Sequence, residues 1–127
     1  MRNLRSERGA AAVEFALVLP VLIVLVLGIV EFGRAFQVQA TLAAAAREGV
    51  RIMAIEDDAT AARAAARSAS ASLNPVLTDA DIAVNPASCA VTAGNATVTI
   101  TYRQPFFTSL FGSGVDLTGQ GVMRCHG

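Results

Sequence analysis

The longest apolar segment lies near the N-terminus and runs from Ala10 to Val30 as AAAVEFALVLPVLIVLVLGIV. As an α-helix, about 21 residues rising ~1.5 Å each would span about 31 Å, which matches the hydrocarbon thickness of a bilayer. A buried helix of a soluble protein normally keeps a polar face, and from Ala16 to Val30 this segment has none. We therefore predict a transmembrane helix over residues 10–30, preceded by a short leader of residues 1–9.

The charges on either side of the apolar segment predict its direction. Arg2, Arg5 and Arg8 precede it, whereas Glu31 and Arg34 follow it and balance each other. An excess of arginine marks the cytoplasmic side of a membrane helix. We expect a cytoplasmic N-terminus and a translocated C-terminal domain.

The alanine-rich region of residues 31–73 predicts extramembrane helices. In its first part the apolar residues recur every three, four or seven positions, as expected for one stripe of a helix. The stripe consists of Phe32, Phe36, Ala43, Ala46, Val50 and Met53. Gly49, beside it, is either a tolerated small residue or a point of close helix contact.

A second, shorter helix is predicted from about Ala59 to Leu73. Asp58 or Thr60 is suited to cap its N-terminus, and Asn74-Pro75 should stop it. The acidic run before it, Glu56-Asp57-Asp58, is interpreted as a cap and bend, because its consecutive carboxylates lack the spacing of a calcium loop.

After residue 74 the apolar period changes to two, which predicts a small antiparallel β domain over residues 74–127. We expect strands at residues 82–84, 88–92, 96–103 and 115–125, with a hairpin across residues 93–95 and an interruption of the last strand by Gly119 and Gly121. In the clearest strand, Val98, Ile100 and Tyr102 share the buried side. The predicted fold class is α+β, with a sheet of three or four strands after the long helix.

The apolar segment of residues 104–114 has three interpretations. Its residues Pro105, Phe106, Phe107, Leu110 and Phe111 suit packing under the sheet, contact with the membrane surface, or binding to a partner. The pattern alone does not choose among them.

Composition narrows the chemistry. The formal net charge is zero, so no strong field favours nucleic acid. No catalytic constellation, metal cluster or phosphate loop is evident, so we expect neither an enzyme, nor a cofactor or metal, nor a small-molecule substrate. Cys89 and Cys125 are either two free thiols or, in an oxidising compartment, one disulfide.

A short motif lies where the leader meets the apolar segment. Arg8-Gly9-Ala10-Ala11-Ala12-Val13-Glu14-Phe15 combines a basic leader, a glycine, a glutamate five residues later and an aromatic residue. Two runs follow: Leu27-Gly28-Ile29-Val30-Glu31-Phe32-Gly33-Arg34-Ala35-Phe36 and Ala46-Arg47-Glu48-Gly49-Val50-Arg51. Together they resemble the TadE-like minor pilins or pseudopilins of the tight-adherence (Tad/Flp) pilus system, a branch of the type IV pilins.

The resemblance implies a function and a set of residue roles. A prepilin peptidase would cut between Gly9 and Ala10, and Glu14 beside Phe15 would pair with the new amine of its own or a neighbouring subunit. The implied partners are the prepilin peptidase, other pilins and the Tad inner-membrane assembly platform. The implied location is the bacterial inner membrane, with the C-terminal domain in the periplasm and, after assembly, at the cell surface or in the pilus.

Three alternatives remain open at this stage. A secretory signal peptide could end at Val38-Gln39-Ala40, although the apolar segment is long for one and contains Glu14 and Pro20. Glu14 could simply reach the membrane interface. The chain could also be an uncleaved, membrane-anchored periplasmic binding or scaffold protein.

Overall fold

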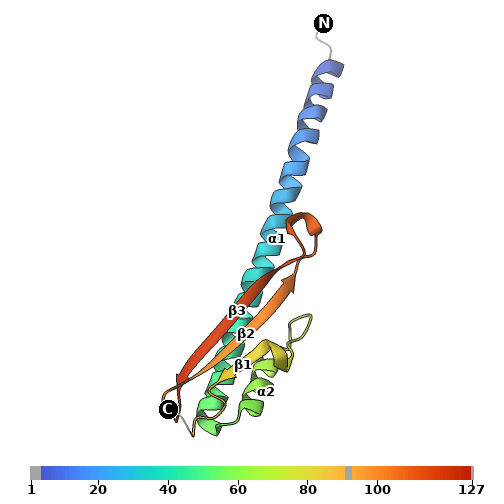
Figure 1. Ribbon diagram of the computed structural model, residues 1–127. Helices are drawn as coiled ribbons and strands as arrows, with labels where there is room; N and C mark the ends of the chain where they lie inside the picture. Colours follow the sequence, from blue (N-terminus) through green and yellow to red (C-terminus); the bar gives the residue numbers. More distant parts are fainter. Residues whose placement is uncertain (1–3, 91–92, 127) are drawn as a thin grey trace. The chain divides into compact units, whose positions relative to one another are not determined.

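The computed structural model describes residues 4–90 and 93–126, so Arg2 of the predicted leader lies outside the described residues. Two helices and a three-stranded antiparallel sheet confirm the predicted α+β class. The elements are α1 (Leu4–Glu56), α2 (Ala59–Ala69), the 3₁₀ turn η1 (Asp79–Asp81), β1 (Ile82–Asn85), β2 (Asn95–Pro105), the 3₁₀ turn η2 (Ser109–Phe111) and β3 (Gly114–Arg124) (Figure 1). The chain divides into an N-terminal unit that ends at Gly33 and a C-terminal unit that begins at Arg34.

The N-terminal unit is the first part of α1, and its apolar side chains face outward. An 18-residue window of α1 has a mean hydropathy of 2.9, and none of it is buried. Leu17 and Ile29, for example, are 69% and 72% exposed. Among the described residues, α1 is the one helix long and apolar enough to cross a membrane, as predicted. Contact with lipid or with other apolar helices would remove this surface from water.

The C-terminal unit contains the sheet, whose strand order is β1-β2-β3. β2 and β3 pair along their whole length, from Asn95 opposite Arg124 to Pro105 opposite Gly114. In Figure 1 they form one long hairpin, with the shorter β1 beside β2. The side chains of Val98, Ile100 and Tyr102 are buried, as their alternation predicts.

One predicted strand is wrong. Residues 88–90 have irregular structure, while Val91 and Thr92 of the same predicted strand lie outside the described residues. β1 ends at Asn85 before Pro86, which has no N–H to donate to a ladder. The expected hairpin across residues 93–95 is therefore replaced by two pairings of β2, with β1 on one side and β3 on the other.

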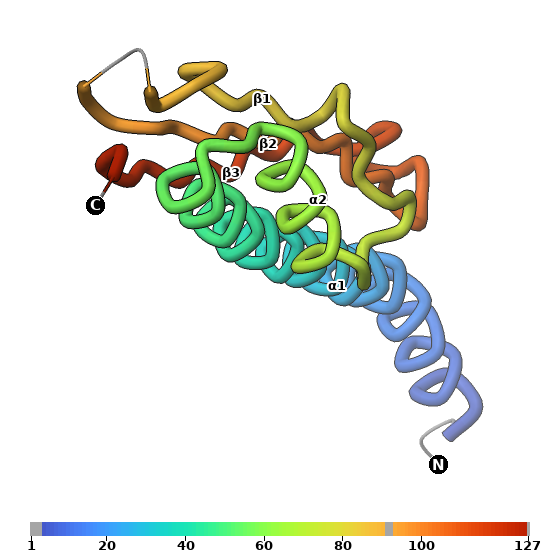
Figure 2. The backbone as a smooth tube through the Cα atoms, turned by 90° about the horizontal axis from the view of Figure 1, so that it is seen from below, coloured from blue at the N-terminus to red at the C-terminus, as the bar shows by residue number. Residues whose placement is uncertain are grey.

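The part of α1 in the C-terminal unit and α2 lie against the same face of the sheet (Figure 2). Gly49 lies where α1, α2 and β2 meet: a Cβ there would be 3.1 Å from the Ala62 carbonyl oxygen and 3.4 Å from a methyl group of Val98. Gly49 is thus a point of close contact, the second of its two predicted interpretations. The buried core is formed by Leu42, Ala45, Ala46, Val50, Met53, Ala62, Ala66, Leu73, Leu77, Ile82, Cys89, Ala96, Val98, Ile100, Tyr102 and Cys125.

Gly119 and Gly121 lie inside β3 and do not interrupt it, contrary to the prediction. A Cβ on Gly119 would lie 2.5 Å from the backbone carbon of Leu42, and one on Gly121 would lie 2.6 Å from the Ala46 carbonyl oxygen. The two glycines stand opposite Ile100 and Val98 in the ladder. They therefore let the backbone of α1 approach β3 closely, while the large side chains of β2 fill the space beside it.

Only part of the apolar stripe predicted for the first helix is buried. Ala46, Val50 and Met53 are buried, but Phe36 is 79% exposed. The helix also buries Ala35 and Leu42, and Leu42 lies where the backbone of α1 approaches Gly119 of β3.

The second helix begins and ends at identifiable caps. The Asp58 carboxylate accepts hydrogen bonds from the backbone N–H groups of Thr60 (2.8 Å) and Ala61 (3.0 Å), which confirms the predicted cap. α2 ends at Ala69, earlier than the predicted Leu73. The Ser70 hydroxyl donates to the Ala66 carbonyl at 2.8 Å and occupies an acceptor at the end of the helix.

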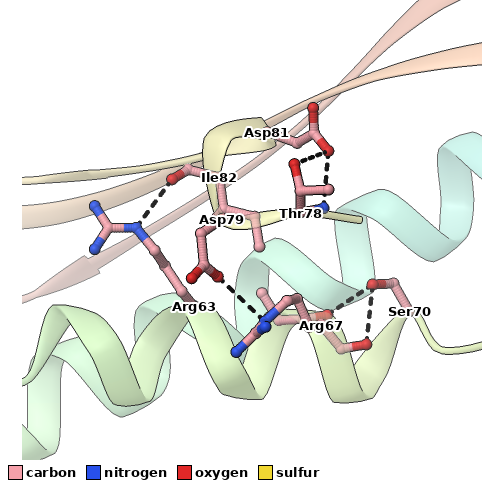
Figure 3. A network of polar contacts seen from close by, with 8 residues as sticks. Arg63, Arg67, Ser70, Thr78, Asp79, Asp81 and Ile82 are labelled. Carbon is pink, nitrogen blue, oxygen red and sulfur yellow. Dashed lines mark hydrogen bonds and ion pairs between the residues drawn. The ribbon is translucent and has the colours of Figure 1, made fainter. Parts of the chain in front are cut away.

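Polar contacts hold α2 against the start of β1 (Figure 3). Arg63 Nε donates to the Ile82 carbonyl oxygen at 3.2 Å, and Arg67 Nε lies 3.2 Å from a carboxylate oxygen of Asp79. Asp81 accepts from the backbone N–H and the hydroxyl of Thr78, which fixes the turn before β1. The Arg67–Asp79 pair is exposed and contributes orientation more than stability.

We expect Gly119→Ala to lower the free energy of unfolding of the C-terminal unit by about 1–3 kcal/mol, because its methyl group would displace the backbone of α1. Unfolding of the full chain in detergent micelles can be followed by the fluorescence of Tyr102, the single tyrosine of a chain without tryptophan. Gly94→Ala is the matched control, since a Cβ there meets nothing within 4 Å. Equal stability of the two variants would contradict the close approach of α1 and β3.

Candidate processing and assembly site

The predicted cleavage position lies within helical backbone. Gly9 and Ala10 belong to α1, which begins at Leu4, and both are exposed. A Cβ on Gly9 would meet nothing within 4 Å, so no packing contact of this chain requires a glycine there. No other segment of the described chain packs against Gly9, although the peptide bond between Gly9 and Ala10 lies within helical backbone.

Glu14 and Phe15 also project from this exposed part of α1, and Phe15 is 65% exposed. Ala10 and Glu14 are four residues apart in one continuous helix, so they lie on the same face with a rise of about 6 Å between them. An amine created at Ala10 would therefore stand one turn from the Glu14 carboxylate. Glu14 is the fifth residue when Ala10 counts as the first, and the helix therefore places the two positions one turn apart.

The later run, Ala46 to Arg51, divides between the core and the surface. Ala46 and Val50 are buried against the sheet. Glu48 and Arg51 form an exposed pair with 3.4 Å between Oε1 and Nη1. This run thus contributes the packing of the C-terminal unit, and its charged residues lie on the outer side of α1.

The disulfide between Cys89 and Cys125 is present, with 5.5 Å between the Cα atoms. It joins the irregular segment after β1 to the residue that follows β3, and it confirms the second of the two predicted options for these cysteines. Closing a loop of this length contributes about 3–4 kcal/mol on chain-entropy arguments. An oxidising compartment is the environment in which such a bond persists.

Asp57 organises the same region, a role that the sequence analysis missed. It follows α1 with φ 52°, and its carboxylate accepts hydrogen bonds from the Ser88 hydroxyl (2.9 Å), the Cys89 N–H and the Ala90 N–H (3.2 Å). The bond from the Cys89 N–H is the largest influence that lowers the pKa of the Asp57 carboxyl, and burial opposes it. The available signal was an aspartate directly after a helix, a residue type that tolerates positive φ.

The chain end is held beside this carboxylate. The His126 N–H donates to the Ala54 carbonyl oxygen at 3.1 Å, and its Nε2 lies 3.2 Å from the Cys89 carbonyl oxygen. Together with the disulfide, these contacts attach the residues after β3 to the end of α1.

Comparison with known proteins gives one family. The model of the TadE-like protein family matches residues 9–51, so the resemblance expected from the motifs is confirmed for this part of the chain. The matched segment begins at Gly9 and includes Glu14, Phe15 and both later runs. No curated protein and no solved structure matches the chain.

Acid titration should destabilise the C-terminal unit through Asp57. Because the pKa of Asp57 is lower in the folded state, its ionised carboxylate stabilises the fold at pH values above the ordinary pKa of 3.8. This stabilisation is lost as the pH falls through the lower folded-state pKa. We expect the melting temperature of the full chain in detergent to fall with acidification over that window, and Asp57→Asn to remove part of this dependence. Asp58→Asn is the control, because asparagine caps a helix as well as aspartate does. An equal fall in melting temperature with acidification in the unmodified chain and both variants would exclude Asp57 as a source of the acid sensitivity.

Proposed function

We propose that this chain is a minor pilin-like or pseudopilin-like subunit that is processed by a prepilin peptidase after Gly9 and takes part in Tad-type pilus assembly. The observation that carries the proposal is the TadE-like match, which starts at Gly9 and continues along an apolar helix whose side chains are exposed. A subunit that moves from a membrane to a helical bundle needs such a surface in both places.

Processing would use the chemistry of the Gly9-Ala10 bond. Glycine weakens a helix by about 1 kcal/mol relative to alanine, so the helix is easier to open there into the extended backbone that a peptidase binds. Arg5 and Arg8 precede the bond and would hold the leader on the cytoplasmic side of the membrane.

Glu14 would supply the assembly contact. A carboxylate inside an apolar segment costs about 2–3 kcal/mol on insertion scales unless it gains a partner. The amine released at Ala10 is such a partner, one helical turn away in the same chain or brought by a neighbouring subunit. A pair between neighbours would set their axial register.

The C-terminal unit supports a minor role in the pilus, because major pilins of the Flp branch are much shorter. It would lie in the periplasm, consistent with its disulfide, and reach the cell surface if the subunit enters the fibre. Other pilins and the inner-membrane assembly platform are the proposed partners. Adhesion and biofilm formation would follow from the pilus, and the chain itself is assigned no catalytic activity.

An uncleaved, membrane-anchored periplasmic scaffold is the second candidate. It is favoured by the continuity of α1 from Leu4 through the Gly9-Ala10 bond, which leaves no break in the helix at the processing position. In this case Arg5 and Arg8 would serve only to orient the span.

Intact mass and N-terminal sequencing of the membrane-extracted protein should give Ala10 as the first residue. Gly9→Val should block the cut, since a branched side chain shields the scissile backbone, whereas Gly33→Val should be processed normally because a Cβ at Gly33 also meets nothing within 4 Å. An intact N-terminus supports the scaffold, and a start at Thr41 supports a signal peptide.

Glu14→Ala should leave membrane insertion and processing intact and reduce incorporation into assemblies about 5- to 30-fold, if pairing contributes the roughly 1–2 kcal/mol typical of such contacts. Sheared surface fractions and membrane fractions can be compared by immunoblotting. Glu7→Ala, which removes a carboxylate of the leader, is the matched control. Normal assembly of the Glu14 variant would exclude amine pairing.

A further inference from the structure

The turn between β2 and β3 presents two large apolar side chains to the surroundings. Phe107 is 70% exposed and Leu110, in η2, is 62% exposed. Figure 1 shows this turn at one end of the hairpin and the C-terminus of the chain at the other. Exposed apolar side chains gathered on one turn are a feature of surfaces that bind something.

The turn has a defined structure. The Phe106 N–H donates to the Ser113 carbonyl oxygen at 3.2 Å, and Arg103 Nη2 donates to the Ser113 hydroxyl at 2.8 Å. Gly112 adopts φ 100°, a conformation that glycine tolerates and that lets the chain return to β3. Phe107 and Leu110 are therefore presented by an ordered turn, so binding through them would not require this segment to lose further conformational entropy.

The turn is attached to the start of the C-terminal unit. The guanidinium carbon of Arg34 lies 3.6 Å from the centroid of the Phe107 ring, a cation–π contact. Arg34 follows Val30, the end of the apolar segment, by four residues, or about 6 Å of helix rise. Phe107 thus contacts the first residue of its own unit, and that residue follows the last residue of the apolar segment by four positions along the chain.

We propose that this turn is a membrane-contact site, at which Phe107 and Leu110 enter the headgroup–acyl boundary of the bilayer that α1 crosses. Arg34 would lie at the level of the lipid phosphates, with its aliphatic stem along the Phe107 ring. The inference rests on the membrane anchoring in the proposed function, and it adds a second, peripheral contact to the span.

A lipid surface fits this turn better than a protein partner does. The exposed apolar area comes mainly from two side chains on one short turn, whereas stable protein interfaces bury about 800 Å² on each partner. A bilayer is also the apolar phase nearest to Arg34 along the chain. Aromatic side chains beside an arginine are a common combination at membrane interfaces.

The absence of tryptophan from the chain makes a direct test possible. Phe107→Trp and the control Val122→Trp, on the 56% exposed Val122 of β3, each introduce one fluorophore into the full-length protein. Both are incorporated at one copy per lipid nanodisc, with or without lipids brominated on their acyl chains. Emission of Phe107→Trp should be blue-shifted and lose about half its intensity to bromine, while Val122→Trp should lose little.

Adding Leu110→Asp to Phe107→Trp should reduce the bromine quenching at least about twofold, because a carboxylate is excluded from the acyl boundary. Equal quenching of Phe107→Trp and Val122→Trp would overturn the proposal. A blue shift that requires several copies per nanodisc would overturn it in favour of contact with a second copy. Co-flotation of both single variants with liposomes separates these results from failure of the span, in which case neither protein would float.

Discussion

The apolar side chains in the first part of α1, within the N-terminal unit, are not covered by the rest of the described chain, and this constraint shapes the molecule. A helix that exposes Leu17, Ile29 and their neighbours is not stable as a free element in water. Contact with lipid or with other apolar helices would remove this surface from water. The chain therefore combines an N-terminal unit that depends on its surroundings with a C-terminal unit that has its own core.

The same helix serves both units by a change of composition. Leucine, isoleucine and valine dominate α1 up to Val30, and alanine dominates after Ala40. Small side chains let the later part of α1 approach the sheet closely, at Gly119 and Gly121. α1 thus has a wide exposed apolar surface in the N-terminal unit and a narrow surface packed against the sheet in the C-terminal unit.

Much of this architecture could be predicted from the sequence, because its signals are local. The apolar segment, the Asp58 cap and the alternation of Val98, Ile100 and Tyr102 each depend on residues close together in the chain. The disulfide could be anticipated only as one of two options. The motif of Gly9, Ala10, Glu14 and Phe15 likewise rested on a short run, and the family match supports the resemblance without testing each residue's role.

The errors arose where distant segments decide the structure. The two glycines of β3 resemble strand breakers until α1 lies against them, and Phe36 of the predicted helix stripe is exposed. The segment after β1 has a strand-like composition, but its N–H groups bond to Asp57, more than 30 residues earlier. Neither the contact of α1 with β3 nor the hydrogen bonds to Asp57 can be recognised from residues that are close together in the sequence.

The disulfide has a mechanical consequence for a protein that is pulled. Force applied between the two ends of the chain would pass along the backbone to Cys89 and cross directly to Cys125, 36 positions later. The intervening hairpin of β2 and β3 lies in a covalent side loop that carries none of this tension. The pairing of β2 with β3 would persist under a load that could extend the rest of the polypeptide, including β1, which precedes Cys89.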